Sequence, residues 1–470
     1  MVFSSMVFIC VFLPIVFILY CVIPSLKLKN LLLVLASLIF YAYGEPVYII
    51  LMLFSSFINY IFGLFVGKEN KSAKVFMILA VAVNIGLLAV FKYAGFFMEN
   101  LNHITGLTLP VPQIELPIGI SFFTFQALSY VIDVYRKQAG KQRNFGNILL
   151  YISFFPQLIA GPIVKYHDID KEINSRCQTP EGVAKGIRRF IIGLCKKVII
   201  ANTMGITADY VFGLELSSVN IASAWIGAIA YALQIYYDFS GYSDMAIGLG
   251  EMFGFHFKEN FLHPYSAESI KKFWRKWHIS LSTWFKEYLY IPLGGNRKGK
   301  VRTGVNKIIV FFCTGLWHGA SWNFVLWGLI HGLFSMLEET RFFPLQKVKT
   351  RWVHHFYTLV IVIVTFVLFR SETLQQGVAL IGRMFTGFQF TAVTISAMWE
   401  PLTPKFLFLI VTAVIFAMPL LDILKQYLQN HKKAAALAEV VSYPGTLILL
   451  LICILDLSSA TFNPFIYFRF

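Results

Sequence analysis

Two histidines in apolar surroundings are the side chains best suited to acid–base chemistry. His278 lies in the segment WHISLS, and His318 lies in GLWHGAS, where Gly315 and Gly319 bracket it. A neutral imidazole can take the proton of an attacking hydroxyl group, so two such rings could activate an alcohol towards an acyl group. An ionisable residue within a membrane span is a functional-site hypothesis by default. Structural roles stay open, as a ring packed among tryptophans for His278 and as a polar contact between helices for His318.

The remaining sequence offers little for metal or covalent chemistry. His331 is thirteen residues from His318, so on one straight helix the two rings point to opposite faces and are poor ligands for one metal ion. The six cysteines include no C-x-x-C pair, and neither G-x-S-x-G nor H-E-x-x-H occurs. We therefore predict no metal site and no bound cofactor.

Acidic residues in an apolar context form a second group, in the segment DFSGYSDMAIGLG. Asp238 and Asp244, with Ser240 between them, could line a path for protons or cations, as in a transporter. They could equally form structural pairs with the cationic segment that follows. Trp317 and Asn323, on either side of His318, are predicted to line or support the same interior.

That cationic segment carries half of the excess charge of the chain. Between Lys258 and Lys307 there are eleven Lys and Arg residues against three acids, which is +8 of the formal +16. Such placement is typical of cytoplasmic loops and of contact with anionic lipid headgroups, so a lipid bilayer is the predicted surrounding. Nucleic-acid binding would require a soluble basic domain, which the sequence does not contain, so no nucleic-acid partner is predicted.

The stretch LGGNRKGKV within this segment is close to a phosphate-binding loop but departs from it. It satisfies G-x-x-x-x-G-K, yet Val301 stands where Ser or Thr should hold magnesium. We predict instead a tight turn, made by its glycines, that presents cations at the membrane surface. These could attract the phosphates of coenzyme A or an acidic donor protein, while a turn that only faces lipid stays open. The donor-binding candidates are Arg275, Lys276, Arg297, Lys298 and Lys300.

Upstream of the turn, residues 270–289 are predicted to form one continuous amphipathic helix. At helical spacing Trp274, His278 and Trp284 fall on one face, whereas Arg275 and the lysines fall on the other. A basic helix rich in tryptophan is typical of elements that lie in the membrane interface.

The elements that hold these residues must be membrane helices. Of the 470 residues, 57% are hydrophobic and 14% are charged, whereas soluble domains carry about a quarter charged residues. Long apolar runs predict an all-α, polytopic integral membrane protein with about ten to twelve transmembrane helices, and re-entrant or interfacial helices in the middle of the chain. We expect a single integral membrane domain over residues 1–470, with chemical motifs at 234–332 and an aromatic tail at 461–470.

Three motifs in chain order carry a resemblance to a known family. DFSGYSDMAIGLG, FWRKWHISLSTWFKEYLYIPLGGNRKG and GLWHGASWNFVLWGLIHG, within residues 238–332, closely resemble the membrane-bound O-acyltransferase superfamily. The similarity is greatest to its bacterial branch, which O-acetylates exported polysaccharides such as alginate and peptidoglycan. The resemblance implies a ring of helices around a central tunnel, with His318 as the catalytic residue and His278 as the second family histidine. The D-alanine transferase of teichoic acid modification is a more distant relative, whose similar segment lacks LGGNRKG.

The resemblance also implies a route for the acyl group. The last residues, FNPFIYFRF, resemble a C-terminal aromatic motif of this branch, so Tyr467 is a candidate acyl acceptor; an interfacial aromatic anchor is the alternative. The donor would be acetyl-CoA or an acyl carrier on the cytoplasmic side, and the partner an extracytoplasmic SGNH-type acetyltransferase. The expected location is the bacterial cytoplasmic membrane. The competing interpretations are a transporter of acetyl groups or ions and a non-catalytic scaffold.

Overall fold

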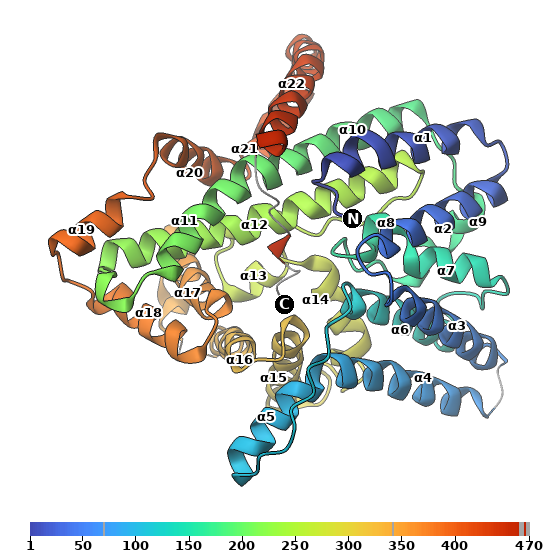
Figure 1. The fold of residues 1–470 in the computed structure, drawn as a ribbon, viewed down its shortest axis with the longest axis horizontal. Helices are drawn as coiled ribbons and strands as arrows, with labels where there is room; N and C mark the ends of the chain where they lie inside the picture. The colour runs from blue at the N-terminus through green and yellow to red at the C-terminus, as the bar shows by residue number, and fades with distance from the viewer. Residues whose placement is uncertain (69–70, 341–342, 460–464, 467–470) are drawn as a thin grey trace. The chain divides into compact units, whose positions relative to one another are not determined.

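The structure, a computed structural model, describes residues 1–68, 71–340, 343–459 and 465–466 (Figure 1). It is 76% helical, and the described residues contain no strand. The all-α class predicted from the sequence is therefore confirmed. The chain forms two compact units: the first comprises Met1–Phe190 with Tyr242–Glu259, and the second comprises Ile191–Gly241 with Asn260–Phe470.

The first unit contains α6, a helix whose side chains are almost all buried and which packs against α3 and α4. The side chains of Asn59 and Asn84 join α3 to α4 by two hydrogen bonds of 3.1 and 2.8 Å. Such paired amides satisfy polar groups where lipid offers no partner. The helices that lie or begin in this unit are α1 (Leu13–Val22), α2 (Leu26–Ala42), α3 (Ile49–Val66), α4 (Ala73–Leu88), α5 (Ala94–Thr105), α6 (Ile120–Tyr135), α7 (Phe145–Ser153), α8 (Phe155–Leu158), α9 (Tyr166–Ser175) and α10 (Pro180–Cys195).

The second unit holds both histidine motifs. Two π-helical turns, η3 (Lys196–Ala201) and η6 (Lys286–Tyr290), lie in it, a geometry that is frequent at functional sites. The helices that lie or begin in this unit are α11 (Asn202–Gly213), α12 (Ile221–Met252), α13 (Ile270–Trp274), α14 (Ile279–Phe285), α15 (Gly299–His318), α16 (Trp322–Leu337), α17 (Arg351–Arg370), α18 (Leu374–Thr386), α19 (Ala392–Trp399), α20 (Pro404–Ala417), α21 (Leu420–Gln429) and α22 (Lys432–Ser459).

Helices α15 and α16 form a hairpin instead of one straight helix. α15 ends at His318, and Ser321 caps α16 by accepting a hydrogen bond from the N–H of Asn323. An accepting Ser side chain satisfies a backbone N–H that the first turn of a helix leaves unpaired, which favours a new start at this point. His318 and His331 therefore lie on separate helices.

Two glycines allow the arms of this hairpin to approach closely. A Cβ atom added to Gly315 would collide with the carbonyl oxygen of Phe324, and one added to Gly328 would collide with that of Phe311. Small residues that let backbones meet are the usual basis of helix packing in lipid. The close approach of α15 and α16 therefore depends on these glycines.

The helices that could cross a membrane are fewer than predicted. Three shorter apolar helices accompany the five long ones, and α19 with α20 would make a sixth span that is bent by 65°. By length and composition, the described part of the chain therefore contains fewer membrane-spanning helices than the ten to twelve predicted. The difference arises because several apolar runs are interrupted by helix ends within them. The long spans are Ile49–Val66, Ala73–Thr105, Pro180–Gly213, Arg351–Arg370 and Lys433–Ser459.

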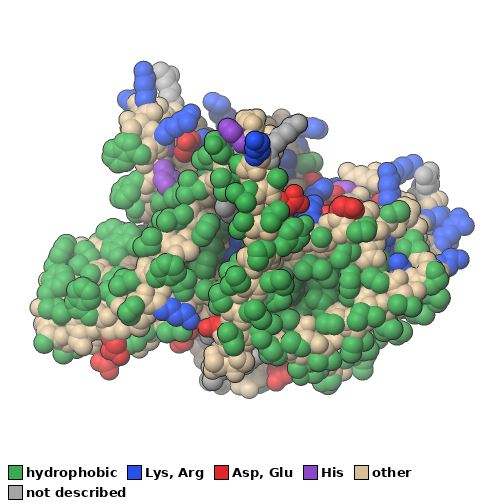
Figure 2. Space-filling model, turned by 90° about the horizontal axis from the view of Figure 1, so that it is seen from above, with side chains coloured by type: hydrophobic (Ala, Val, Ile, Leu, Met, Phe, Trp, Pro, Cys, Tyr) green, Lys and Arg blue, Asp and Glu red, His purple; other side chains and the backbone are tan. Residues whose placement is uncertain are grey.

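The outward surface suits a hydrocarbon environment. Hydrophobic side chains cover much of the face seen in Figure 2. Along α22 the exposed residues include Val440, Leu447, Leu451 and Leu455. Only 6% of the most apolar stretch of this helix is buried. Contiguous apolar surface of this kind marks membrane contact. The protein is therefore a multi-pass membrane protein.

We predict that Gly315→Ala destabilises the second unit, because the added methyl group has no space against the backbone of α16. The expected loss is about 1 to 3 kcal/mol, as for other overpacked sites, measured by thermal unfolding of the protein in detergent. Gly86→Ala in α4 is the matched control, since nothing lies within 4 Å of its added Cβ. Equal stability of the two variants would contradict the close-approach role.

Candidate active site

The segment that carries His278 is broken. α13 ends at Trp274 and α14 begins at Ile279, with His278 between them in left-handed backbone at a φ of 44°. The predicted continuous helix over residues 270–289 is therefore wrong. Left-handed backbone costs a residue with a side chain about 1 to 2 kcal/mol, and strain of this kind clusters at functional sites.

The two faces predicted for this segment are nevertheless correct. Trp274, Trp284 and His278 are buried, whereas Arg275 and Lys286 are exposed. The break changes the path of the backbone but leaves the apolar side chains directed inward. Hydrophobic spacing thus determined which residues are buried even though it did not reveal the turn between the two helices.

Hydrogen bonds from the segment that precedes α13 hold the break. The N–H of Ile279 donates to the carbonyl oxygen of Asn260 at 3.0 Å, and the N–H of Leu262 donates to that of Lys276 at 3.0 Å. Asn260 Oδ1 also accepts from the N–H and the hydroxyl of Ser280, at 3.1 and 2.9 Å. Asn260 therefore ties the start of α14 through both its backbone and its side chain. No motif in the sequence singles it out.

The same Asn260 oxygen fixes the tautomer of His278. Nδ1 of the imidazole lies 3.3 Å from Asn260 Oδ1. Because this oxygen accepts from the backbone N–H of Ser280, it is the carbonyl oxygen of the amide, and Nδ1 must carry the hydrogen between them. Nε2 then keeps its lone pair, and among the described residues it has no hydrogen-bond partner. The ring is set to accept a proton at Nε2.

His318 lies beside His278, although forty residues separate them in the chain. The centroids of the two rings are 6.3 Å apart. Both side chains are buried, with relative exposures of 2% for His318 and 0% for His278. At this separation one reacting group between the rings can contact both. The structure therefore brings together the two residues that sequence analysis predicted to be catalytic.

Aromatic rings surround the histidine pair. Phe239 lies edge-on to the first imidazole at a centroid distance of 4.6 Å. Trp317, which was predicted to line the interior, contacts both imidazoles, at 5.7 and 5.0 Å. Trp327 and Phe369 each lie 5.2 Å from the second. An enclosure of this kind excludes bulk water and strengthens the electrostatic interactions inside it.

The third histidine of the region, His331, has a structural environment. Its Nδ1 accepts a hydrogen bond from Nε1 of Trp274 at 3.2 Å, and its Nε2 lies 3.0 Å from the hydroxyl of Thr365. Both ring nitrogens are therefore occupied by partners on α13 and α17. Among the described residues no group of three or more His, Cys, Asp and Glu side chains could hold a metal ion.

The carboxylates of α12 are paired with cations that precede them in the chain. Asp238 forms a buried ion pair with Lys197 at 2.7 Å, and Asp244 accepts two hydrogen bonds from Arg189, at 2.8 and 3.0 Å. Structural pairing was one of the predicted alternatives, with the downstream cations as expected partners. Sequence analysis missed Lys197, although a lysine within an apolar run is a recognisable signal.

The other predicted polar residues lie in the interior as well. Ser240 is buried on α12. Nδ2 of Asn323 donates to the carbonyl oxygen of Ser371 at 2.6 Å, which ties the start of α16 to the end of α17. This bond indicates a supporting role for Asn323, since its amide is engaged with backbone.

The glycine turn predicted before α15 is present. Gly294, Gly295 and Gly299 have φ values of 108°, 55° and 82°, which side chains disfavour. Nδ2 of Asn306 holds the turn by donating to the carbonyl oxygen of Gly295 at 2.9 Å. Since the described residues contain no strand, this is not the strand–loop–helix arrangement of a nucleotide-binding loop.

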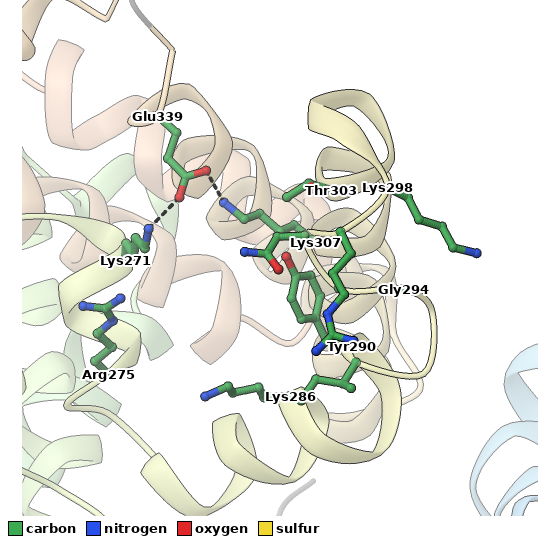
Figure 3. Close-up of a pocket in the computed structure, with 13 residues that line it drawn as sticks. Lys271, Arg275, Lys286, Tyr290, Gly294, Lys298, Thr303, Lys307 and Glu339 are labelled. Carbon is green, nitrogen blue, oxygen red and sulfur yellow. Dashed lines mark hydrogen bonds and ion pairs between the residues drawn. The ribbon is translucent and has the colours of Figure 1, made fainter.

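A cationic pocket of about 750 Å³ lies between this turn and α13 (Figure 3). Three of the five donor-binding candidates line it, namely Arg275, Arg297 and Lys298, whereas Lys276 and Lys300 do not. In Figure 3, Lys298 extends away from the other labelled side chains. The cations that sequence analysis did not select but that also line the pocket are Lys271, Lys286 and Lys307.

A single carboxylate organises part of this pocket. Glu339 accepts from the ammonium groups of Lys271 and Lys307, at 2.7 and 2.5 Å. Burial raises the pKa of the Glu339 carboxyl, but the two ammonium groups outweigh this effect and hold the pKa below its ordinary value. Arg275 and Arg297 have no ion-pair partner in the described part of the chain, so their charge is available to an anion.

The C-terminal aromatic tail is described only at Phe465 and Ile466. Tyr467, the predicted acyl acceptor, lies outside the described residues. Phe465 and Ile466 are both buried, so at these two positions the tail is packed within protein.

In this multi-pass helical protein, two neighbouring imidazoles in an aromatic enclosure could exchange protons with a bound reactant. Residues 121–374, more than half of the chain, match the family model described as MBOAT, membrane-bound O-acyltransferase family. The chain belongs to this family and is an acyltransferase.

Individual relatives extend the similarity to the whole length. The chain is 38% identical to a probable alginate O-acetylase of Pseudomonas putida and 38% identical to one of Azotobacter vinelandii, covering 100% of both chains in each case. It is 36% identical to a peptidoglycan O-acetyltransferase of Helicobacter pylori, over 81% of this chain and 79% of the relative. The resemblance stated from the three motifs is therefore confirmed.

We predict that Asn260→Ala lowers the rate of acyl transfer because it frees the tautomer and position of His278. The expected fall in kcat is about tenfold or more, the scale of a lost buried hydrogen bond, with the KM for donor unchanged. The control is Asn59→Ala, which removes an equally buried asparagine on α3. If both variants lose stability alike and keep the same kcat, the positioning role of Asn260 is wrong.

Proposed function

We propose that this protein transfers an acetyl group from a cytoplasmic donor, acetyl-CoA or an acyl carrier, across the membrane for O-acetylation of an exported cell-surface polysaccharide. The observation that carries the proposal is the pair of buried imidazoles, 6.3 Å apart, inside an aromatic enclosure. The names of the relatives support the acetyl group and the polymer, since they are described as alginate O-acetylases and a peptidoglycan O-acetyltransferase.

The chemistry that fits this pair is acyl transfer from a thioester to a hydroxyl. The hydroxyl oxygen bonds to the carbonyl carbon, the carbon–sulfur bond breaks, and the hydroxyl proton passes through an imidazole to the leaving thiolate. His318 deprotonates or orients the hydroxyl. The second family histidine was expected to position or polarise the thioester carbonyl, but polarisation requires an N–H donor. The Asn260 contact uses the Nδ1 hydrogen of His278, so Nε2 suits a role in holding or deprotonating the hydroxyl.

The cationic pocket supports binding of a phosphate-bearing donor. Arg275 and Arg297 offer guanidinium groups, which bind phosphate through paired hydrogen bonds. Glu339 limits the positive charge of the pocket by engaging two of its lysines. This arrangement suits the phosphates of coenzyme A or of a carrier-bound pantetheine, while the acyl end reaches the histidines.

The acetyl group would leave on the outer side of the bacterial cytoplasmic membrane. Tyr467 is the candidate intermediate acceptor within the chain. An extracytoplasmic SGNH-type acetyltransferase is the candidate partner that completes the modification of the polymer. The helices around the site would leave a central tunnel through which donor and acceptor meet.

Transport is the competing function, and the pairing of the α12 carboxylates argues against it. Asp238 and Asp244 are each paired with a cation, whereas a relay needs groups that release and take up charge. Incubation of purified protein with acetyl-CoA labelled in the acetyl group separates the two functions. Release of free CoA with acetylation of protein or acceptor supports the enzyme, and the absence of both supports transport.

We predict that His318→Ala abolishes O-acetylation of the polymer while the protein stays folded in the membrane. Loss of a general base lowers rates by about 10² to 10⁴. The measurement is the acetate content of the exported polysaccharide in a deletion strain that carries the variant, with membrane levels checked by immunoblot. Wild-type acetate content would reject the catalytic role.

We predict that Arg275→Ala with Arg297→Ala raises the KM for the donor about tenfold or more with little change in kcat, because phosphate binding is lost before the chemical step. The effect should shrink at high ionic strength, where exposed charges are screened. Arg383→Ala, which removes a half-buried arginine of α18 outside the pocket, is the matched control. An unchanged KM in the double variant would exclude the pocket as a donor site.

A further inference from the structure

The backbone of the C-terminal tail is bound by a carboxylate of α12. The N–H of Ile466 donates to Oδ2 of Asp238 at 2.7 Å. Phe465 and Ile466 are 3% and 4% exposed, so this bond lies within protein. A hydrogen bond to a charged acceptor in such a place is stronger than one between neutral groups.

The other oxygen of the same carboxylate belongs to a buried cation. Oδ1 of Asp238 lies 2.7 Å from Nζ of Lys197, and both side chains are buried. Burying two charges is costly unless their remaining hydrogen-bonding capacity is used. The tail amide supplies a further hydrogen-bond donor to this carboxylate. The carboxylate therefore binds the Lys197 ammonium through one oxygen and the tail N–H through the other.

The local backbone is shaped to bring Lys197 to this position. Lys197 lies on the π-helical turn η3, which follows α10. A Cβ atom at Gly241, one turn after Asp238, would lie 2.7 Å from the carbonyl oxygen of Gly193 and 3.1 Å from the N of Lys197. The absence of that Cβ lets α12 approach η3 closely enough for the ion pair.

The docked tail is also connected to the histidine enclosure. Phe465 packs against Phe239 with ring centroids 6.0 Å apart, and Phe239 contacts His278 at 4.6 Å. Asp238 and Phe239 are adjacent on α12, so one short stretch of this helix contacts both the tail and the imidazole.

We propose that the Lys197–Asp238 pair is a docking site for the tail backbone at Phe465 and Ile466, and that this docking contact supports acyl transfer at the histidine pair. Asp238 and Lys197 are positioning residues, since they act through the tail. The inference rests on the proposed function in one respect, because a docked tail affects turnover only if acyl transfer takes place at these histidines. A purely structural ion pair between η3 and α12 is the alternative, and it does not require the N–H of Ile466.

Two changes remove the docking contact in different ways. Ile466→Pro deletes the N–H donor and leaves the ion pair intact, and Ile466→Val is its matched control, which keeps the N–H. The double variant Lys197→Met with Asp238→Leu deletes the acceptor; replacement of a whole buried ion pair by apolar residues is often neutral for stability. Lys405→Met breaks an exposed ion pair with Asp456 and is the control for loss of charge.

The experiment measures two quantities on the full chain in detergent or nanodiscs. Hydrogen-exchange mass spectrometry follows the C-terminal peptide, and an acetyl-transfer assay gives kcat and the KM for donor. In Ile466→Pro and in the double variant, tail exchange should accelerate and kcat should fall, each by about tenfold or more, with the KM for donor unchanged. Ile466→Val should keep the protection of the tail, and Lys405→Met should keep both quantities.

Two outcomes would overturn the proposal. Unchanged tail exchange in the double variant would show that the pair does not dock the tail. Faster exchange with an unchanged kcat would show that docking has no role in transfer, which leaves the structural ion pair. Failure of the proposed function is distinguishable, because it would appear as full transfer by His318→Ala with the tail-exchange results unaffected.

Discussion

At His278 the backbone turns left-handed, and the geometry of the candidate active site depends on this one residue. The turn ends α13 and starts α14, and it places the imidazole beside His318 instead of leaving it within a regular helix. Asn260 maintains the turn with its backbone carbonyl and selects the tautomer with its side chain. A strained backbone conformation persists only when surrounding contacts hold it in place. Here the same asparagine holds the turn and also sets which nitrogen of His278 carries the hydrogen.

The interior accommodates polar side chains in two distinct ways. Around the histidines it is aromatic and uncharged, so a neutral imidazole can exist there without a counterion. Along α12, by contrast, the charges are present but matched, with Asp238 held by Lys197 and Asp244 by Arg189. This division suits acyl transfer, in which a proton moves over a short distance at the reacting group. A conduction path would need titratable groups in succession.

Sequence patterns predicted the class of fold and the identity of the buried side chains well. The apolar faces near Trp274 and Trp284 followed from helical spacing, and the glycine turn before α15 followed from residue type, because positive φ strongly favours glycine. Spacing failed where a helix stops inside an apolar run, as after Trp274 and after His318. Such stops depend on capping by Ser321 and on hydrogen bonds from Asn260, which are tertiary or single-residue features that periodicity does not register.

The candidate site was predicted less completely than the fold. The two histidines lie within sequence motifs. Asn260 and Lys197 were recognised as site residues only from the side chains that they contact in the structure. The expected span count also exceeded the helices of sufficient length, because hydropathy counts apolar runs and not the continuous helices within them.

The exposed surface of α22 has a consequence for reconstitution. This helix is exposed over most of its apolar length, so in a bilayer its tilt should respond to bilayer thickness, with a cost of fractions of a kcal/mol for each ångström of mismatch. It is also the last helix before the C-terminal segment. Acyl-chain length of the surrounding phospholipid is therefore an experimental variable for turnover, and short-chain and long-chain bilayers would not be interchangeable media for this enzyme.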